Sequence, residues 1–299
     1  MEPKANSMSI DSEDSRAGAS LPLAPGRPRE IEAASNLYLV HPASRAIVDI
    51  LARTPVTPNQ VSVASVFTSA AAAMSYVALP WPWNAFAGVT FQFVWHVLDG
   101  ADGDLARRTG RASPVGELVD GVCDHVSQGL IYIAFAIMVQ RSLGPLAWGV
   151  AVAAAASHFL QANAYETGRK AYRRFVYGAP WMRQTGAGER GPGAWLARFY
   201  LGVSSWFSPG EAGVERAMDA AASRTGRAIY RETFAPIVKA SGILGSNMRT
   251  IACFLAVLAM RPLWFFLFEL IALNAALLIL AAWRTHANAA LTRRLEAAT

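Results

Sequence analysis

Long apolar segments with few charges alternate with short polar breaks along most of the chain. The apolar segments cover residues 61–79, 84–103, 115–140, 144–166, 247–260 and 263–283. A helix needs roughly 20 apolar residues to cross a bilayer, and most of these segments have about that length. Segment 247–260 is short, so we expect its helix to begin near residue 243. The pattern predicts an all-α integral membrane protein built as a six-transmembrane helix bundle.

The polar stretches define the other parts of the chain. The first part is rich in Ser, Pro, Ala and Gly, which is typical of a disordered tail. The second part repeats apolar residues at helical spacing among charged ones, which predicts an amphipathic surface helix. The expected domains are the tail (1–35), the surface helix (36–56), the six-helix transmembrane domain (57–283) with a long helical cytoplasmic loop inserted at 167–246, and a cytoplasmic C-terminal tail (284–299).

Local signals mark the start and the end of the first span. In TPNQVS (57–62), Thr57 is a residue type preferred at helix N-caps and Pro58 suits the first helical position. PWPWN (80–84) carries no charge and two tryptophans, a composition typical of a turn at the membrane interface. The first span therefore runs from TPNQVS to PWPWN.

The composition agrees with a membrane protein. Hydrophobic residues make up 53% of the chain and charged residues 16%, whereas soluble domains carry roughly 25% charged residues. The net charge of +6 does not indicate a nucleic-acid partner here, because Lys and Arg are expected at cytoplasmic membrane edges. Cys123 and Cys253 both lie in apolar segments, so we expect no disulfide framework.

Six spans would place both termini on the same side of the membrane. Of the 27 Lys and Arg residues, only Arg141 and Arg261 fall on the opposite side in this arrangement. The positive-inside rule makes the crowded side cytoplasmic. We therefore expect both termini and the 103–115 turn in the cytoplasm, with the protein in the cell inner membrane if it is bacterial.

Carboxylates gather at the facing ends of two neighbouring spans. Asp99 and Asp102 are three residues apart, and Asp120 and Asp124 are four apart. Each pair therefore points from one face of its own helix. The connection between the two helices is short, so they should be antiparallel neighbours whose four carboxylates converge.

Four adjacent unpaired carboxylates at a membrane edge would repel one another. They would have to be protonated, paired with arginines or bridged by metal ions. Oxygen ligands favour Mg²⁺ or Mn²⁺ over Zn²⁺. Two such ions about 4 Å apart are a standard arrangement for phosphoryl chemistry. Asp104 and Glu117 lie in the same stretch, and we interpret them as solvent-exposed residues that take no part in the site.

Residues 99–124 follow the pattern D-x2-D-G-x2-A-R-x8-G-x3-D-x3-D. This pattern resembles the signature of the CDP-alcohol phosphotransferases, also called phosphatidyltransferases, which are integral membrane enzymes of phospholipid biosynthesis. TPNQVS also resembles the motif before the first span of that family. Every signature position is filled, by Asp99, Asp102, Gly103, Ala106, Arg107, Gly116, Asp120 and Asp124.

The resemblance implies a transferase that moves a substituted phosphate from a CDP-linked donor to an acceptor alcohol and releases CMP. Asp99, Asp102 and Asp120 would hold two Mg²⁺ or Mn²⁺ ions. Asp124 would contribute to one of them and act as the general base. The motif positions expected to contact the nucleotide or substrate are Gly103, Ala106, Arg107, Ser113, Gly116, Asn59 and Ser62.

The family uses two kinds of donor, and the sequence does not separate them. The donor is either CDP-diacylglycerol with a polar acceptor, which we expect here, or a small CDP-alcohol with a lipid acceptor. Arg169, Lys170 and Arg173 follow the fourth span and would suit an acceptor phosphate, as in glycerol phosphate or inositol phosphate. They suit anionic lipid heads or a plain cytoplasmic boundary equally well. The family also suggests a homodimer.

Two other functions are compatible with aspartates at span ends. An aspartate-rich membrane prenyltransferase also uses Mg²⁺ and a diphosphate, but its two acidic motifs are usually much farther apart than Asp102 and Asp120. A non-catalytic ion-binding or transport protein would bury the aspartates along an ion path. The filled nucleotide motif argues against the second alternative.

Overall fold

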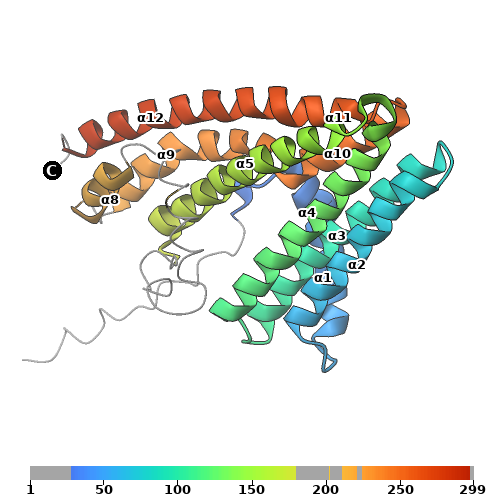
Figure 1. The fold of residues 1–299 in the computed structure, drawn as a ribbon. Helices are drawn as coiled ribbons and strands as arrows, with labels where there is room; N and C mark the ends of the chain where they lie inside the picture. The colour runs from blue at the N-terminus through green and yellow to red at the C-terminus, as the bar shows by residue number, and fades with distance from the viewer. Residues whose placement is uncertain (1–27, 180–201, 203–210, 221–223, 297–299) are drawn as a thin grey trace, which may run out of the picture.

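Every element in the described part of the chain is a helix. The structure is a computed structural model and describes residues 28–179, 202, 211–220 and 224–296. The elements, most of them labelled in Figure 1, are η2 (Arg29–Ile31), η3 (Asn36–Val40), α1 (His41–Leu51), α2 (Pro58–Ala78), α3 (Trp83–Arg108), α4 (Pro114–Leu143), α5 (Leu146–Tyr177), α8 (Glu211–Ala220), α9 (Arg224–Ala240), η4 (Ser241–Leu244), α10 (Ser246–Leu258), α11 (Leu263–Leu267), η5 (Phe268–Leu273) and α12 (Asn274–Glu296).

Side-chain caps define where α2 and α4 begin. The Thr57 hydroxyl accepts a hydrogen bond from the Gln60 backbone N–H (3.3 Å), and the Gln60 side chain accepts one from the Thr57 N–H (2.9 Å). This capping box satisfies two backbone donors that the first helical turn leaves unpaired. At the start of α4, Ser113 Oγ accepts from the Gly116 N–H at 3.0 Å. The N-cap predicted at Thr57 is confirmed.

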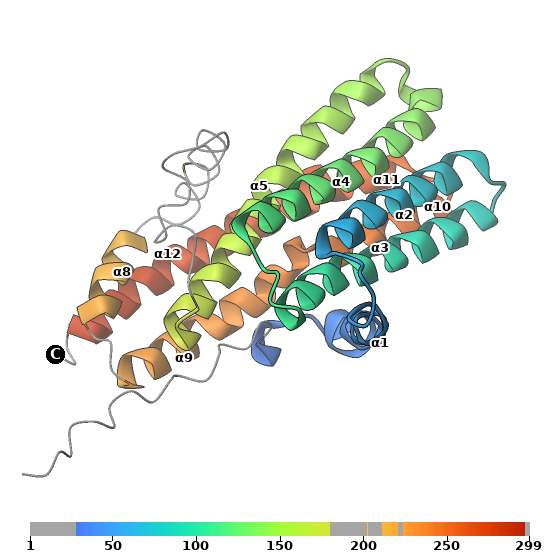
Figure 2. The same cartoon turned by 90° about the horizontal axis from the view of Figure 1, so that it is seen from below.

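Helices α2, α3 and α4 lie side by side in both views (Figures 1 and 2). Helix α2 packs against both α3 and α4. Gly88 allows a close contact between α2 and α3, because a Cβ at this position would lie 2.2 Å from the Tyr76 ring. Phe135 of α4 and Phe265 of α11 pack in the same core as Tyr76. This packing fixes the start of α3 and the second half of α4 against α2.

A second apolar core lies toward the C-terminus of the chain. The later part of α5 packs there with α8, α9 and α12, and Figure 2 shows these helices extending away from α2 and α3. Tyr172, Phe234 and Leu291 are fully buried in this core. The long helices α5 and α12 contribute to both ends of the molecule.

Four helical stretches of the described residues are long and apolar enough to cross a membrane. They are Pro58–Ala78, Val115–Leu143, Thr225–Leu258 and Leu263–Leu295. Helices α3 and α5 have sufficient length but bury polar side chains, among them Gln92, His96, Gln161 and Asn163. Their polarity keeps them out of this set, so the count of six spans stays a prediction.

Three boundaries differ from the sequence-based prediction. The disordered tail expected over 1–35 does not extend through residues 28–35, because Ile31 and Glu32 are buried at 1% and 2% exposure. The C-terminal tail expected over 284–299 is helical through Glu296, with Leu291 and Leu295 buried. Part of the expected 167–246 insertion continues α5 through Tyr177, and another part leads directly into α10. These segments are held by tertiary packing, which their polar composition did not reveal.

The expected surface helix at 36–56 corresponds to η3 and α1. Val48 packs on Val61 of α2 and on α3, and the Ser44 hydroxyl donates to the Val97 carbonyl at 2.8 Å. Tyr38, Leu39 and Ile50 are exposed apolar residues on the same segment. Its position on a membrane surface stays a prediction.

Candidate functional site

The facing ends of α3 and α4 bring three motif aspartates together. Asp99 comes from α3, and Asp120 and Asp124 come from α4. Each offers one carboxylate oxygen, and these three oxygens lie within 4.8 Å of one another. Residues 109–113 connect the two helices. Because this connection is short, the aspartates at the end of α3 and at the start of α4 come close together. The predicted convergence therefore holds for these three carboxylates.

Asp102 lies next to this cluster in different surroundings. It is 4% exposed and accepts hydrogen bonds from the Ser62 hydroxyl of α2 and from the Gly103 N–H. Asp102 also interacts with Asp120. The fourth motif carboxylate is thus packed behind the other three.

The cluster has the donor set that a hard divalent cation requires. All its ligand atoms are carboxylate oxygens, which suit Mg²⁺ or Mn²⁺. Like charges at this spacing in a half-buried site repel one another, and a cation between them removes that repulsion. The residues present therefore fit a divalent metal ion.

The expected nucleotide contacts lie beside the cluster, at the starts of α2 and α4. A Cβ on Gly116 would lie 3.2 Å from Ser113 Oγ and 3.5 Å from Asn59 Oδ1. Glycine at 116 thus allows a hydroxyl and an amide to approach the α4 backbone closely. Ser62, one turn after Asn59, is buried and holds Asp102. Here the structure brings Asn59, Ser113 and Gly116 together.

The remaining motif residues follow Asp102 on α3. The Arg107 guanidinium lies close to Gly103. A Cβ on Gly103 would lie 3.4 Å from Arg107 Nη1. The guanidinium also forms an ion pair with Asp104, for which the sequence predicts contact with solvent only. Ala106 is half-buried. Asp104 is therefore a partner of the motif arginine in this structure.

The basic residues at the end of α5 have different partners. Arg169 binds two carboxylates, Glu32 at 2.6 Å and Glu166 at 2.9 Å. Lys170 pairs with Glu117 at 3.1 Å, so Glu117 is not only solvated. Arg173 forms no ion pair within 4 Å among the described residues, and its Nε is buried without a hydrogen-bond partner.

Arg173 lies in positively charged surroundings. Burial lowers its pKa below the ordinary arginine value, and the nearby cations Arg169 and Arg107 lower it further. These effects disfavour the charged form, and a bound anion would relieve them. Of the three predicted acceptor residues, Arg173 has the environment most suited to an anion.

Three buried charged residues could not be placed from the sequence: Glu32, Arg249 and Glu269. Glu32 lies in the segment assigned to the tail, and nothing in its polar neighbourhood signals burial. Arg249 and Glu269 form an ion pair at 3.2 Å with side chains 3% and 0% exposed. The sequence contained a signal for this pair, because charged residues inside apolar segments are rare and usually paired.

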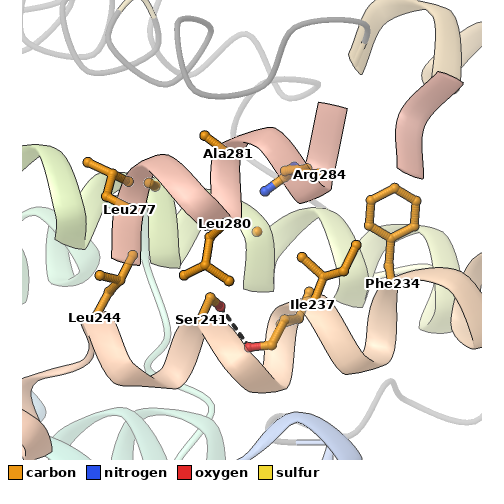
Figure 3. Close-up of a pocket in the computed structure, with 11 residues that line it drawn as sticks. Phe234, Ile237, Ser241, Leu244, Leu277, Leu280, Ala281 and Arg284 are labelled. Atoms are coloured by element: carbon orange, nitrogen blue, oxygen red, sulfur yellow. Dashed lines mark hydrogen bonds between the residues drawn. The ribbon is translucent and has the colours of Figure 1, made fainter. Parts of the chain in front are cut away.

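A separate cavity lies between α5, α9, η4 and α12 (Figure 3). Its walls are mostly apolar, and Ser241 and Arg284 are its polar residues. The Ser241 hydroxyl donates to the Val238 carbonyl at 2.7 Å, as the dashed line shows. No motif aspartate lines this cavity, so it is not the candidate site.

Comparison with known proteins identifies the same region. A sequence model of the CDP-alcohol phosphatidyltransferase family matches residues 55–185. Cholinephosphotransferase 1 of Gallus gallus is 35% identical over 63 residues, which cover 21% of this chain and 19% of the relative. An uncharacterized CDP-alcohol phosphatidyltransferase class-I family protein 2 of Dictyostelium discoideum is 41% identical over 61 residues, or 20% of this chain and 14% of the relative.

The matched segments are short parts of both relatives, so these likenesses concern a domain and not a whole protein. The family match contains the capping motif of α2, both acidic helix ends and the basic end of α5. Residues 55–185 therefore match a CDP-alcohol phosphatidyltransferase domain.

Proposed function

We propose that this protein is a divalent-metal-dependent CDP-alcohol phosphotransferase of phospholipid biosynthesis. It would transfer a substituted phosphate from CDP-diacylglycerol to an acceptor alcohol and release CMP. The observation that carries the proposal is the gathering of Asp99, Asp120 and Asp124 within 4.8 Å, inside the family match. These carboxylates stand at the positions of the family motif.

The four aspartates would hold the metal ions. Asp99, Asp120 and Asp124 would each offer one of the carboxylate oxygens that lie within 4.8 Å of one another, and Asp102 would complete the set from its buried position. Two bound Mg²⁺ or Mn²⁺ ions would neutralise charge that develops on the leaving phosphate. The hydrogen bond from Ser62 orients the Asp102 carboxylate.

Asp124 would be the general base. Its carboxylate oxygen would accept the proton of the acceptor hydroxyl while the alcohol oxygen attacks the phosphorus distal to cytidine. A carboxylate is a weak base, so it works on a hydroxyl that is already in hydrogen-bond contact. The rigid start of α4 at Ser113 keeps the Asp124 backbone in place for this contact.

The cytidine diphosphate would bind along the starts of α2 and α4 and the end of α3. Ser113 Oγ and Asn59 Oδ1 both lie close to Gly116 there, so that the donor would meet a hydroxyl, an amide and bare helix backbone. Gly103 and Ala106 would leave room for the ligand on the same side of α3. Arg107 would exchange its contact with Asp104 for a bidentate contact with phosphate oxygens.

We propose a phosphorylated polar acceptor, such as glycerol phosphate or inositol phosphate, with Arg173 as its main anion contact. Arg173 is a partly buried cation without an ion-pair partner within 4 Å among the described residues. Lys170 would assist by leaving Glu117. Arg169 already pairs with two carboxylates, so we assign it a structural role in the site and not a contact with the acceptor.

A second donor class has one observation in its favour. The Gallus gallus relative is named for phosphocholine transfer, and its match covers a fifth of this chain. A small CDP-alcohol donor with a lipid acceptor is therefore the second candidate. In that case the cation at Arg173 would have no acceptor phosphate to bind.

The test is metal-dependent CMP release by purified protein in lipid, with CDP-diacylglycerol or CDP-choline as donors and a panel of acceptors. We expect release with CDP-diacylglycerol and Mg²⁺ or Mn²⁺, and none after chelation. Asp124→Asn should lower the rate by about 100-fold or more. Asp104→Asn is the matched control from the same acidic stretch and should keep most of the activity.

Several results would contradict the proposal. Full activity of Asp124→Asn would remove the assigned base. Release of CMP from CDP-choline alone would select the second donor class. Turnover of a prenyl diphosphate without cytidine would favour a prenyltransferase, and ion flux without any CMP release would favour a transport protein.

A further inference from the structure

The N-terminal segment places a buried carboxylate against α5. The Glu32 side chain is 1% exposed, and its Oε1 accepts a hydrogen bond from Arg169 Nη2 at 2.6 Å. Its Oε2 faces Asn36 Nδ2 at 3.2 Å and His41 Nε2 at 3.5 Å. Both oxygens of Glu32 are therefore engaged, and the side chain is held in one orientation.

Arg169 links this carboxylate to the candidate site. Its Nη1 donates to Glu166 Oε1 at 2.9 Å, and its guanidinium lies over the Tyr165 ring at 5.3 Å. Glu166 in turn lies close enough to Asp124 to interact with it electrostatically. The cation is thus held between two carboxylates, beside the aspartate cluster.

Loss of the Glu32 charge would leave a largely buried guanidinium with a single carboxylate. A buried ion that loses one partner is strongly destabilised, so its side chain turns toward other anions within reach. Asp124 of the aspartate cluster interacts electrostatically with Glu166, and the cluster is rich in carboxylate oxygens. An arginine that reached it would compete with a metal ion for the same oxygens.

We propose that Glu32 is a positioning residue of the metal site: it holds Arg169 against Glu166 and so keeps this cation away from Asp99, Asp120 and Asp124. The inference rests on the metal site of the proposed function. It adds to the site a residue from outside the 55–185 family match, contributed by the segment that precedes α1.

The experiment is Mn²⁺ titration of the full-length protein in lipid nanodiscs, followed by electron paramagnetic resonance. Glu32→Gln keeps the side-chain size and removes the charge, and we expect it to weaken Mn²⁺ binding by about tenfold. Glu32→Asp keeps the charge and should retain most of the affinity. The double variant Glu32→Gln with Arg169→Gln removes the competing cation and should restore wild-type affinity.

Glu30→Gln is the matched control. Glu30 also ties the N-terminal segment to α5, because it accepts hydrogen bonds from the hydroxyls of Tyr172 and Tyr177. Its variant should loosen the segment without freeing Arg169, and Mn²⁺ affinity should stay at the wild-type level. Equal weakening in Glu30→Gln and Glu32→Gln would show a general structural effect and overturn the inference.

The other outcomes are also decisive. Unchanged Mn²⁺ affinity in Glu32→Gln, or no recovery in the double variant, would overturn the positioning role. Absence of Mn²⁺ binding in the wild type would overturn it together with the metal site. Wild-type protein that binds Mn²⁺ but releases no CMP would leave the inference standing while the proposed reaction fails.

Discussion

Asp102 and Asp124 carry the same side chain in different surroundings. Asp102 is buried and accepts hydrogen bonds from Ser62 and the Gly103 N–H, so its oxygens are partly occupied. Asp124 offers one carboxylate oxygen to the group that it forms with Asp99 and Asp120. The family motif implies a metal ligand at Asp102 and the base at Asp124. Their different surroundings are consistent with the proposed roles, in which Asp102 would be an anchored ligand and Asp124 the base.

Gly116 gives a prediction for the nucleotide side of the site. Gly116→Ala would place a Cβ 3.2 Å from Ser113 Oγ and 3.5 Å from Asn59 Oδ1, in the space proposed for the donor. We expect the KM for the CDP-linked donor to rise by about tenfold, because a displacement of well under 1 Å disturbs substrate positioning. Steady-state CMP release at varied donor concentration measures this.

Gly129→Ala is the control for that prediction. Gly129 is also on α4, and a Cβ there would have open space. Alanine favours helix over glycine by roughly 1 kcal/mol, so this variant should be as stable as the wild type or more so. A similar rise in donor KM for both variants would show that α4 as a whole, and not the space at Gly116, governs donor binding.

At the scale of elements, buried polar contacts join α5, α10, η5 and α12. Arg249 of α10 binds Glu269 of η5 and the side chain of Gln161 on α5. Gln161 also donates to Asn274 at 2.9 Å, which extends the network to α12. The π-helical turn at Phe268–Leu273 carries Glu269 at 0% exposure. The apolar pattern predicted helices here, but the network that joins them required their packing.

Breaking the Arg249–Glu269 pair should destabilise the bundle. Arg249→Gln leaves the buried Glu269 without its cation, and loss of one partner of a buried pair typically costs about 3–5 kcal/mol. We expect a clear fall in the thermal unfolding midpoint of the protein in detergent. The matched control is Arg261→Gln, because Arg261 is exposed in the turn before α11 and should have little effect.

The double variant Arg249→Met with Glu269→Leu tests the reason for that result. It removes both charges and replaces them with apolar side chains, so it should recover much of the lost stability. If the double variant is as unstable as Arg249→Gln, hydrogen bonds to Gln161 and the Leu244 carbonyl contribute more than the ion pair.

At the scale of the whole molecule, segments far apart in sequence close the second core. Ile31 packs with residues of α5, α8, α9 and α12, although it precedes the family match. Asn247 of α10 donates hydrogen bonds to Ser35 and Asn36 at 2.7 Å. The N-terminal segment is therefore part of the folded unit, and its contacts explain why Glu32 can reach Arg169.

The six-span arrangement is testable with single cysteines in a cysteine-free background. We expect cysteines in the Arg141 and Arg261 turns to react with a membrane-impermeant reagent from outside intact cells. Cysteines in the 109–113 connection and at the C-terminus should react only after permeabilisation, because the positive-inside rule puts them in the cytoplasm. Labelling of the C-terminus in intact cells would contradict an even number of spans with cytoplasmic termini.

The sequence by itself determined the helical class, the cap at Thr57, the acidic ends of α3 and α4 and the match of residues 55–185 to the family model. These features depend on local spacing, side-chain chemistry and apolar length, all of which are readable along the chain. Only the tertiary structure decided that Asp102 is buried next to the other aspartates and that residues 28–35 and 284–296 are packed. It also decided that Arg169 pairs with two carboxylates, whereas Arg173 forms no ion pair within the part of the chain that the structure describes. Burial and pairing depend on contacts between residues distant in sequence, such as the 137 positions that separate Glu32 from Arg169.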